Sequence, residues 1–348
     1  MPNLKNSRLA SIVILLTLLC YSCGEKDSHK NMDVDIEGKS LSTYRFDQDV
    51  FQADYSNPAN VKQNLSAKYG NFLCEYVEVI LGAGACDSVS TYASLGRFAS
   101  MQDYKDLENE IQVNFPQARL DSITEALKVG IARMQHALPQ VVWPKIYFMN
   151  SGFNLSSYCK EDYVAIGLDF YLGQNNKFTQ MVPFPAYQKE DMTLNQLVPS
   201  TLKNMAYYYL LNTDTLTRDN DMLAEMVFHG KAMYATWLSF EEISNEDLMS
   251  WSSDQVRWAE AHTLQIWKEV AKQDVLFSKN RIEIKKWFDV GPFTHVGNVP
   301  QESPPQLGIW MGFLMVKSYM EKNPGISVDR LFHETNNQKI LQAYKPEL

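Results

Sequence analysis

The sequence predicts an α+β fold that is mostly helical and contains one small sheet. Over most of the chain, apolar residues recur every three or four positions, which is the spacing of one helix face. Between about Val141 and Leu168 this pattern gives way to short β-branched and aromatic runs, which are typical of strands. Hydrophobic residues make up 45% of the chain and aromatic residues 12%, so it can build a sizeable core and is not a disordered protein.

The N-terminus has the charge order of a bacterial lipoprotein signal peptide. Lys5 and Arg8 precede an apolar run from Leu9 to Tyr21, and no further charge appears before Glu25. The run is too short to span a bilayer as a mature helix, which needs roughly 20 apolar residues. It ends with a small residue before Cys23, so we expect cleavage of residues 1–22 and acylation of Cys23. An ordinary signal peptide is the alternative.

Acylation would place the mature chain on a membrane. Two or more acyl chains on Cys23 make anchoring stable, whereas one holds a protein only marginally. Removal of residues 1–22 takes two positive charges from a chain of net charge −9 and leaves −11. This acidic balance disfavours nucleic acid as a partner. Residues 23–43 are polar, which predicts a flexible tether. Residues 44–348 are predicted to form a single domain. We expect the protein in the cell envelope, anchored by lipid at the outer membrane.

The first half of this domain is predicted to be helical. Asn57-Pro58 has the form of an N-cap followed by a first-turn proline. The apolar stripe from Val61 to Ile80 predicts one long helix after it. Two further helices are expected over Met101–Phe115 and over the stripe from Leu120 to Leu138.

Two strands are predicted in the middle of the chain. The first lies within residues 141–149, where Pro144 favours an edge position because proline has no N–H to donate. The second covers Tyr163 to Leu168, after a turn-rich segment. The later half is predicted to be helical around residues 198–209, 222–237, 256–270 (with a cap at Ser252 or Ser253), 307–320, 328–332 and 338–344, with a long loop over 289–305.

The mature chain keeps three cysteines, so one must remain unpaired. We expect Cys74, which lies in an apolar helical pattern, to be a buried free thiol. A disulfide between Cys74 and Cys86 is the alternative, and Cys159 is the third cysteine.

No motif predicts a known catalytic centre. His333-Glu334 is followed at the second histidine position of a zinc-peptidase helix by Asn337, and no nucleophile elbow, P-loop or dinucleotide fingerprint occurs. Glu225 and His229 stand four residues apart on a predicted helix and are weak metal-ligand candidates. A helix-surface ion pair or a core histidine is the alternative. We therefore assign no catalytic residue, no metal and no cofactor, and expect no enzyme.

Carboxylates near the strands leave a glycosidase open. A hydrolase of that class uses a pair of acidic side chains. Such residues at strand ends are more often solvated or capping groups. They are Glu161, Asp162, Asp169, Glu190 and Asp191.

Several segments resemble a known family. They include the run Ile166-Gly-Leu-Asp-Phe-Tyr-Leu-Gly173, the segment His229-Gly-Lys-Ala-Met-Tyr234, the segment Ser303-Pro-Pro-Gln-Leu-Gly-Ile-Trp-Met-Gly312 and the ending Tyr344-Lys-Pro346. In this order, after a lipoprotein signal, they resemble the gliding motility-associated lipoprotein GldB family. The resemblance spans the chain from about Tyr44 and implies an envelope lipoprotein needed for surface gliding and linked to the type IX secretion machinery.

The family is also similar to a set of predicted zinc peptidases, and this implies a degenerate zincin-like metallopeptidase architecture. The zinc helix would correspond to about Leu197–Leu211, which holds neither His nor Glu. The later helix that often carries a ligating Glu-Gly-x-Ala corresponds to His229-Gly230-Lys231-Ala232. The resemblance therefore implies a non-catalytic scaffold that binds envelope proteins of the gliding or secretion machinery. An envelope hydrolase, peptidase-like or glycosidase-like, with a non-standard site is the alternative.

Overall fold

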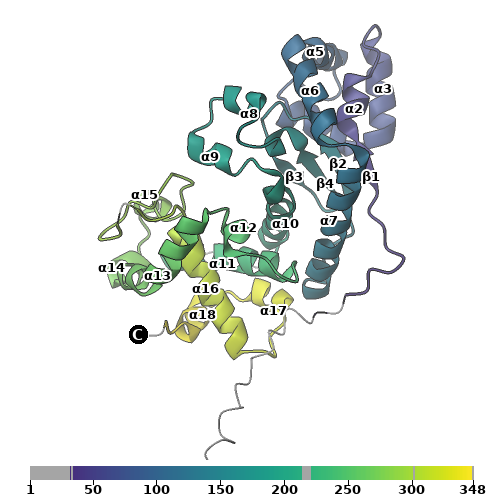
Figure 1. Ribbon diagram of the computed structural model, residues 1–348. Coiled ribbons are helices and arrows are strands. Elements are labelled where there is room, and N and C mark those ends of the chain that lie inside the picture. The colour runs from purple at the N-terminus through teal and green to yellow at the C-terminus, as the bar shows by residue number, and fades with distance from the viewer. Residues whose placement is uncertain (1–31, 33, 214–220, 301, 347–348) are drawn as a thin grey trace, which may run out of the picture. The chain divides into compact units, whose positions relative to one another are not determined.

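A mixed four-stranded sheet lies among helices in the computed structural model, which describes residues 32, 34–213, 221–300 and 302–346 (Figure 1). The strands are β1 (Thr43–Arg45), β2 (Lys145–Met149), β3 (Ser157–Cys159) and β4 (Tyr163–Gly167). Their order across the sheet is β1-β2-β4-β3, with β1, β2 and β4 parallel and β3 antiparallel to β4. The expected α+β class with a small sheet is confirmed. The signal peptide and Cys23 lie outside the described residues.

Helices make up most of the remaining chain. Those before and within the sheet region are α2 (Phe46–Phe51), α3 (Pro58–Tyr69), α4 (Asn71–Glu75), a π-helical turn (Tyr76–Ile80), α5 (Val89–Ser100), α6 (Gln102–Asn114), α7 (Gln117–Ala137), and a 3-10 turn (Leu168–Tyr171) after β4. Those that follow are α8 (Lys177–Met181), α9 (Ala186–Glu190), α10 (Leu194–Leu211), α11 (Met222–Leu238), α12 (Asn245–Met249), α13 (Ser253–Val270), α14 (Gln273–Leu276), α15 (Arg281–Lys285), α16 (Leu307–Lys322), α17 (Val328–His333) and α18 (Asn337–Ala343).

One face of the sheet carries an aromatic core. Side chains alternate across a strand, so Tyr147 and Tyr163 share a face and join the buried residues of α2, α3, α4 and α5 in one cluster. The ring of Phe72 stacks on Tyr147 with centroids 4.5 Å apart. Phe46 meets Tyr76 edge to face at 4.6 Å. The first helices therefore bury their apolar stripes against the sheet.

The prediction that β2 lies at a sheet edge is wrong. β2 pairs with β1 on one side and β4 on the other. Pro144 is accommodated because it precedes the strand, and the first N–H needed for pairing belongs to Lys145, which donates to the Asp162 carbonyl at 2.9 Å. A proline directly before a strand removes no ladder hydrogen bond.

The single long helix expected from Val61 to Ile80 is also wrong. The start is as expected, since the Asn57 side chain accepts hydrogen bonds from the N–H groups of Ala59 and Asn60. Helix α3 then ends at Tyr69, and Gly70 adopts a φ of 53°. Glycine reaches this left-handed region without the steric cost of a Cβ. The apolar spacing continues past Gly70, but the backbone turns there and begins α4.

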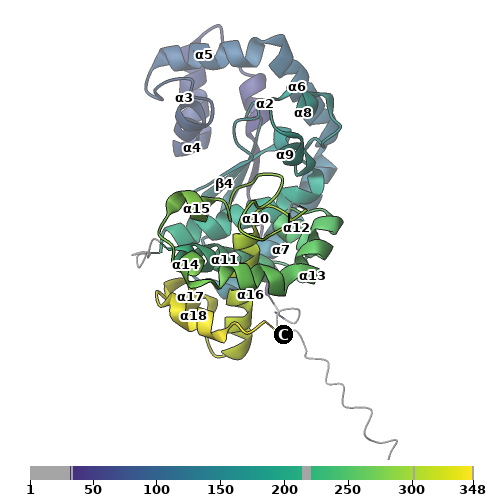
Figure 2. The ribbon, with the colours of Figure 1, turned by 90° about the vertical axis from the view of Figure 1, so that its left-hand side faces the viewer.

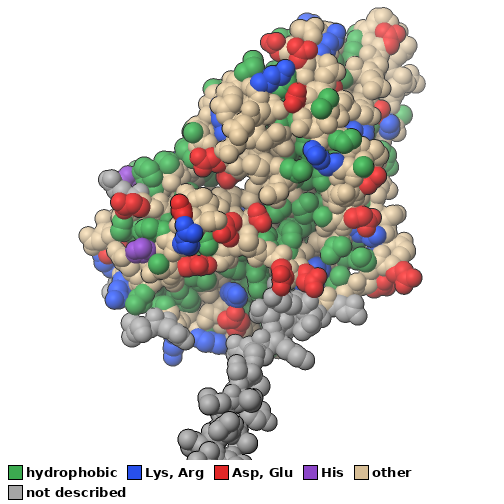
Figure 3. Space-filling view, viewed as in Figure 1, with side chains coloured by type: hydrophobic (Ala, Val, Ile, Leu, Met, Phe, Trp, Pro, Cys, Tyr) green, Lys and Arg blue, Asp and Glu red, His purple; other side chains and the backbone are tan. Residues whose placement is uncertain are grey.

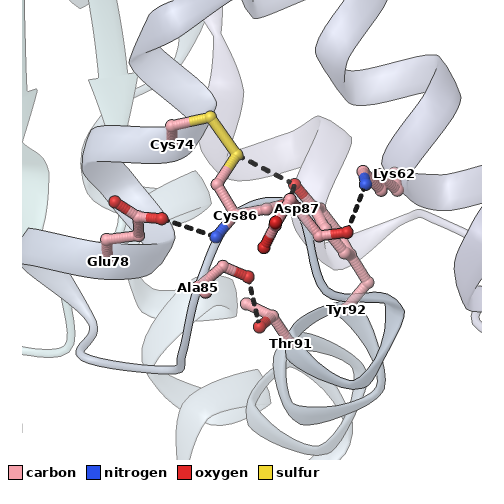
Figure 4. The surroundings of a disulfide bond; sticks show 8 residues. All are labelled: Lys62, Cys74, Glu78, Ala85, Cys86, Asp87, Thr91 and Tyr92. Carbon is pink, nitrogen blue, oxygen red and sulfur yellow. Dashed lines mark hydrogen bonds between the residues drawn. A yellow bond between two sulfur atoms is a disulfide. The ribbon is translucent and has the colours of Figure 1, made fainter.

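Cys74 and Cys86 form a disulfide, so the expectation of a free thiol at Cys74 is wrong (Figure 4). The chain turns back after the π-helical turn, and this brings the two Cα atoms within 5.0 Å. The Glu78 carboxylate accepts the Cys86 N–H at 2.6 Å, and the Tyr92 hydroxyl donates to the Cys86 carbonyl at 3.1 Å. Disulfides persist in oxidising compartments, so the bond agrees with an exported protein. Cys159 is a free thiol whose pKa is raised to about 12 by burial.

The second half packs around α11. Helix α11 lies against α10 on one side and α16 on another (Figure 2). Helix α10 in turn contacts β3 and β4, and its Asn204 amide donates to the Ser157 hydroxyl. Ser252, one of the two predicted cap candidates, caps α13 in a capping box with Gln255. Among the described residues, no helix is both long and apolar enough to cross a membrane.

Candidate functional site

Two adjoining cavities lie beside α10 and α11. The larger has a volume of about 440 Å³ and the smaller about 250 Å³. Met249 and Gln306 line both, so the two spaces meet at these residues. The surface is hollowed between the region of α9 and that of α12, with acidic side chains beside the hollow (Figure 3). We take these adjoining cavities as the candidate site and refer to them below as the cleft.

The smaller cavity brings together three polar side chains from two helices. Lys203 and Tyr207 stand one turn apart on α10, so they project from the same side of that helix. His229 reaches the same cavity from α11. Helix α11 begins at an Asp221 cap, whose carboxylate accepts the Ala224 N–H at 2.9 Å. The packing of α10 against α11 therefore places a lysine, a phenol and an imidazole around one space.

His229 is held by its neighbours. Its Nδ1 forms a hydrogen bond of 2.7 Å with the Tyr207 hydroxyl. The ring of Phe288 stacks on its imidazole with centroids 5.0 Å apart and an interplanar angle of 23°. Burial raises the pKa of Tyr207 well above its usual value, so this phenol stays protonated at neutral pH. These contacts fix the orientation of the imidazole.

Lys203 is an unusual lysine because it is largely withdrawn from water. Burial lowers its pKa to about 8, and the negative charge of Asp191 offsets part of that effect. Its Nζ lies 3.5 Å from the Ser250 hydroxyl, which donates to the Gln196 side-chain oxygen at 2.9 Å. Ser250 has a φ of 57°, a left-handed conformation that few non-glycine residues adopt. The serine is thus presented to Lys203 by a strained end of α12.

A long loop closes one side of the cleft. Gln306 ends this loop with a φ of 60° and lines both cavities. Inside the loop, Thr294 donates its hydroxyl to the Pro304 carbonyl at 2.9 Å and Ser303 donates to the Thr294 carbonyl at 3.0 Å. These buried hydrogen bonds tie the two arms of the loop together. The part of the cleft wall that contains Gly291 and Pro305 is therefore held in place by hydrogen bonds within the loop.

The two weak metal-ligand candidates contact different side chains. His229 bonds Tyr207, whereas the Glu225 carboxylate lies 3.4 Å from the Arg281 guanidinium. In the parts of the chain that the structure describes, no group of three or more His, Cys, Asp or Glu side chains is arranged to hold a metal ion.

Asp169, one of the five carboxylates near the strands, lies in a buried network instead. It accepts hydrogen bonds from the Ser151 N–H at 3.1 Å, from the Ser151 hydroxyl at 2.8 Å and from the Phe153 N–H at 2.5 Å. Burial raises its pKa to about 6. These bonds join the carboxyl ends of β2 and β4, so Asp169 holds two loops together. Glu161 and Asp162 are exposed in the turn before β4, and Glu190 and Asp191 line the larger cavity.

A comparison with known protein families shows which family the chain belongs to. The family model described as gliding motility protein GldB matches residues 27–346, nearly the whole chain. The chain belongs to this family. No curated protein and no solved structure matches it. Membership in the GldB family associates the chain with gliding motility. The family is described as one of lipoproteins, and this associates the chain with the cell envelope.

Segments that carry the GldB resemblance contribute to the cleft. His229 begins one of them, on α11, and Gln306 lies in the segment that leads into α16. Lys203, Ser250 and Trp251 were not identified from the sequence. Lys203 and Tyr207 lie on a predicted helix, but neither is a zinc-ligand residue type, so the sequence did not single them out. Nothing in the local sequence could have placed Ser250 beside that helix.

Proposed function

We propose that this chain is a lipid-anchored envelope protein that supports the gliding or type IX secretion machinery by binding another of its components, without catalysing a reaction. Family membership supports the association with gliding, and the signal-like N-terminus ending at Cys23 supports the anchor. The observation that carries the non-catalytic part is the Lys203, Tyr207 and His229 cluster between α10 and α11.

By the resemblance to zinc peptidases, the first ligand helix would correspond to about Leu197–Leu211 and the third ligand to His229. The side chains of that first helix that line the smaller cavity together with His229 are Lys203 and Tyr207. Zinc in proteins is held by Cys, His, Asp or Glu. Only His229 is of that kind, its Nδ1 is bonded to Tyr207, and the partly buried amine of Lys203 adds positive charge. These residues therefore do not fit a zinc site.

A second candidate, a serine hydrolase, has one observation in its favour. An amine with a pKa of about 8 is partly neutral at physiological pH, and a neutral lysine 3.5 Å from a serine hydroxyl is a possible general base. Two contacts weigh against it. The Ser250 hydroxyl donates to Gln196 rather than to Lys203. The N–H groups of Trp251 and Ser252 donate to Glu246 and Gln255, so they do not form an oxyanion hole. We therefore favour binding over hydrolysis.

The experiment is recovery of the tagged, lipidated protein from its native envelope after cross-linking, followed by identification of the proteins recovered with it. We expect proteins of the gliding or secretion machinery, and an unchanged set from a Ser250→Ala strain that still glides. Recovery of the protein alone, together with loss of gliding and loss of labelling by a fluorophosphonate probe in Ser250→Ala, would overturn the proposal in favour of the hydrolase.

A further inference from the structure

The larger cavity of the cleft has an acidic wall. Four carboxylates line it, those of Glu190, Asp191, Glu246 and Asp247. Among the described residues that line this cavity, there is no lysine, arginine or histidine. The chain offers a polar space of about 440 Å³ with one sign of charge.

Glu190, Glu246 and Asp247 supply most of the negative charge of this wall, because burial raises the pKa of Asp191 to about 7. Among the described residues, none of the four forms a salt bridge within 4.0 Å. Lys203 is near enough to influence Asp191 but lines only the smaller cavity. Several like charges around a concave surface focus a potential that attracts a ligand of opposite charge. The favoured occupant is therefore a cation.

The rest of the wall suits a cationic side chain on a peptide. Trp251 contributes a largely buried aromatic ring to this wall, with 5% of its surface exposed. Tyr187 adds a second aromatic ring, and aromatic faces accept the stem and head of Arg or Lys. The exposed amides of Gln174 and Asn195 can pair with backbone N–H and C=O groups.

We propose that the larger cavity binds an extended peptide segment of a partner protein, and that an arginine or lysine side chain of that segment lies between the Glu190/Asp191 and Glu246/Asp247 pairs. This inference rests on the proposed binding function and names the chemistry of the partner. One basic side chain fills only part of the cavity. The flanking backbone of the peptide would occupy the rest and pair with the neutral amides of Gln174 and Asn195. A free small cation would use the carboxylates but not those amides.

The test measures peptide binding to the full-length lipidated protein in detergent. The probe is a library of blocked, fluorescein-labelled nine-residue peptides with randomised flanks and a fixed central residue. We expect enrichment of peptides with central Arg or Lys over the same flanks with central Gln or Glu. For the best peptide, Glu246→Gln/Asp247→Asn should weaken binding about tenfold or more, because each lost charge-assisted hydrogen bond is worth roughly a factor of ten.

The matched control is Asp121→Asn/Glu125→Gln, which removes two exposed carboxylates from α7, outside the cavity. It should leave the affinity unchanged. Equal binding of the central Arg and Gln peptides, or equal binding by the two double variants, would overturn the inference. Free arginine amide that competes as strongly as the unlabelled peptide would also overturn the inference, since the flanking backbone would then contribute nothing to binding.

The outcome is separable from that of the proposed function. Mass spectrometry of the peptides after incubation shows whether they are cut. Intact peptides with no basic preference would refute the acidic-wall inference and leave the binding function standing. Peptides with a basic preference that are cut, with cutting lost in Ser250→Ala, would refute the non-catalytic function and leave the specificity standing.

Discussion

Gly230 of α11 and Gly312 of α16 meet backbone to backbone. A Cβ built on Gly230 would strike the carbonyl of Gly312, and one built on Gly312 would strike the carbonyl of Met226. These two glycines therefore allow the close packing of α11 against α16, and they lie in two of the segments that carry the family resemblance. The packing sets the position of His229, the residue before Gly230, at the cleft.

Adding a methyl group at this crossing should separate the helices. We expect Gly312→Ala to lower the free energy of unfolding by about 1–3 kcal/mol, because the obstructing atoms are backbone and cannot rotate away. Urea denaturation followed by circular dichroism measures this. Gly325→Ala is the control, since a Cβ there meets nothing within 4 Å. Equal stability of Gly312→Ala and the parent would contradict the packing described.

The disulfide should stabilise the domain. Cys74→Ser/Cys86→Ser is expected to lose about 2–4 kcal/mol, the usual worth of a bond that closes a short loop, here with a sequence separation of 12. A reducing agent should cause a similar loss in the parent and little further loss in the double variant. Cys159→Ser, which alters the free thiol, should leave the sensitivity to reductant intact. A parent protein indifferent to reductant would contradict the bond.

Lys203 should make the folded state more stable as pH rises above about 8. Its folded pKa of about 8 lies below the unfolded value of 10.5, so between these values the unfolded chain holds more protons. Stability gained from this group therefore increases from about pH 8 towards 10.5. Denaturation of Lys203→Met at pH 7.5 and 9.5 should show a smaller rise than the parent, whereas Lys285→Met, at an exposed lysine, should keep it. An unchanged rise would show that the amine is fully hydrated.

The anchor prediction concerns residues outside the described structure. Cys23→Ala should abolish incorporation of a fatty-acid label and release the protein from, or misplace it within, the envelope, because the thiol that carries lipid is gone. Cys20→Ala should be labelled and fractionate as the parent does. Unchanged labelling of Cys23→Ala would remove the assignment of a lipoprotein.

Much of the architecture follows from spacing along the sequence. The stripes that predict α7 and α10, the Asn57 cap and the Ser252 cap are each determined by residues within one or two turns, and each is found. Strand β3 was not predicted, because Ser157–Cys159 is short and pairs only through contact with β4. Gly70 gives no periodic signal, so the break between α3 and α4 was missed.

The cleft was only partly predictable. The resemblance pointed to the helix that holds Lys203 and Tyr207 and to His229, yet the Ser250 contact depends on how α12 packs against α10. The Cys74–Cys86 bond depends in the same way on the chain turning back after Ile80. Contacts between separate elements carry no signature in the residues that make them, and these are the features that the sequence left open.

The described chain enters the sheet at its edge. Residues 34–42 lead into β1, a strand of three residues that pairs with β2 alone. The Trp143 indole donates to the Ser40 carbonyl at 2.8 Å, and the Arg45 guanidinium pairs with buried Asp47 at 2.5 Å. Any mechanical load between a membrane anchor and the domain would reach these few contacts first. The strand would act as a weak link in series with the helical body, so that the anchor end could peel while the cleft stays folded.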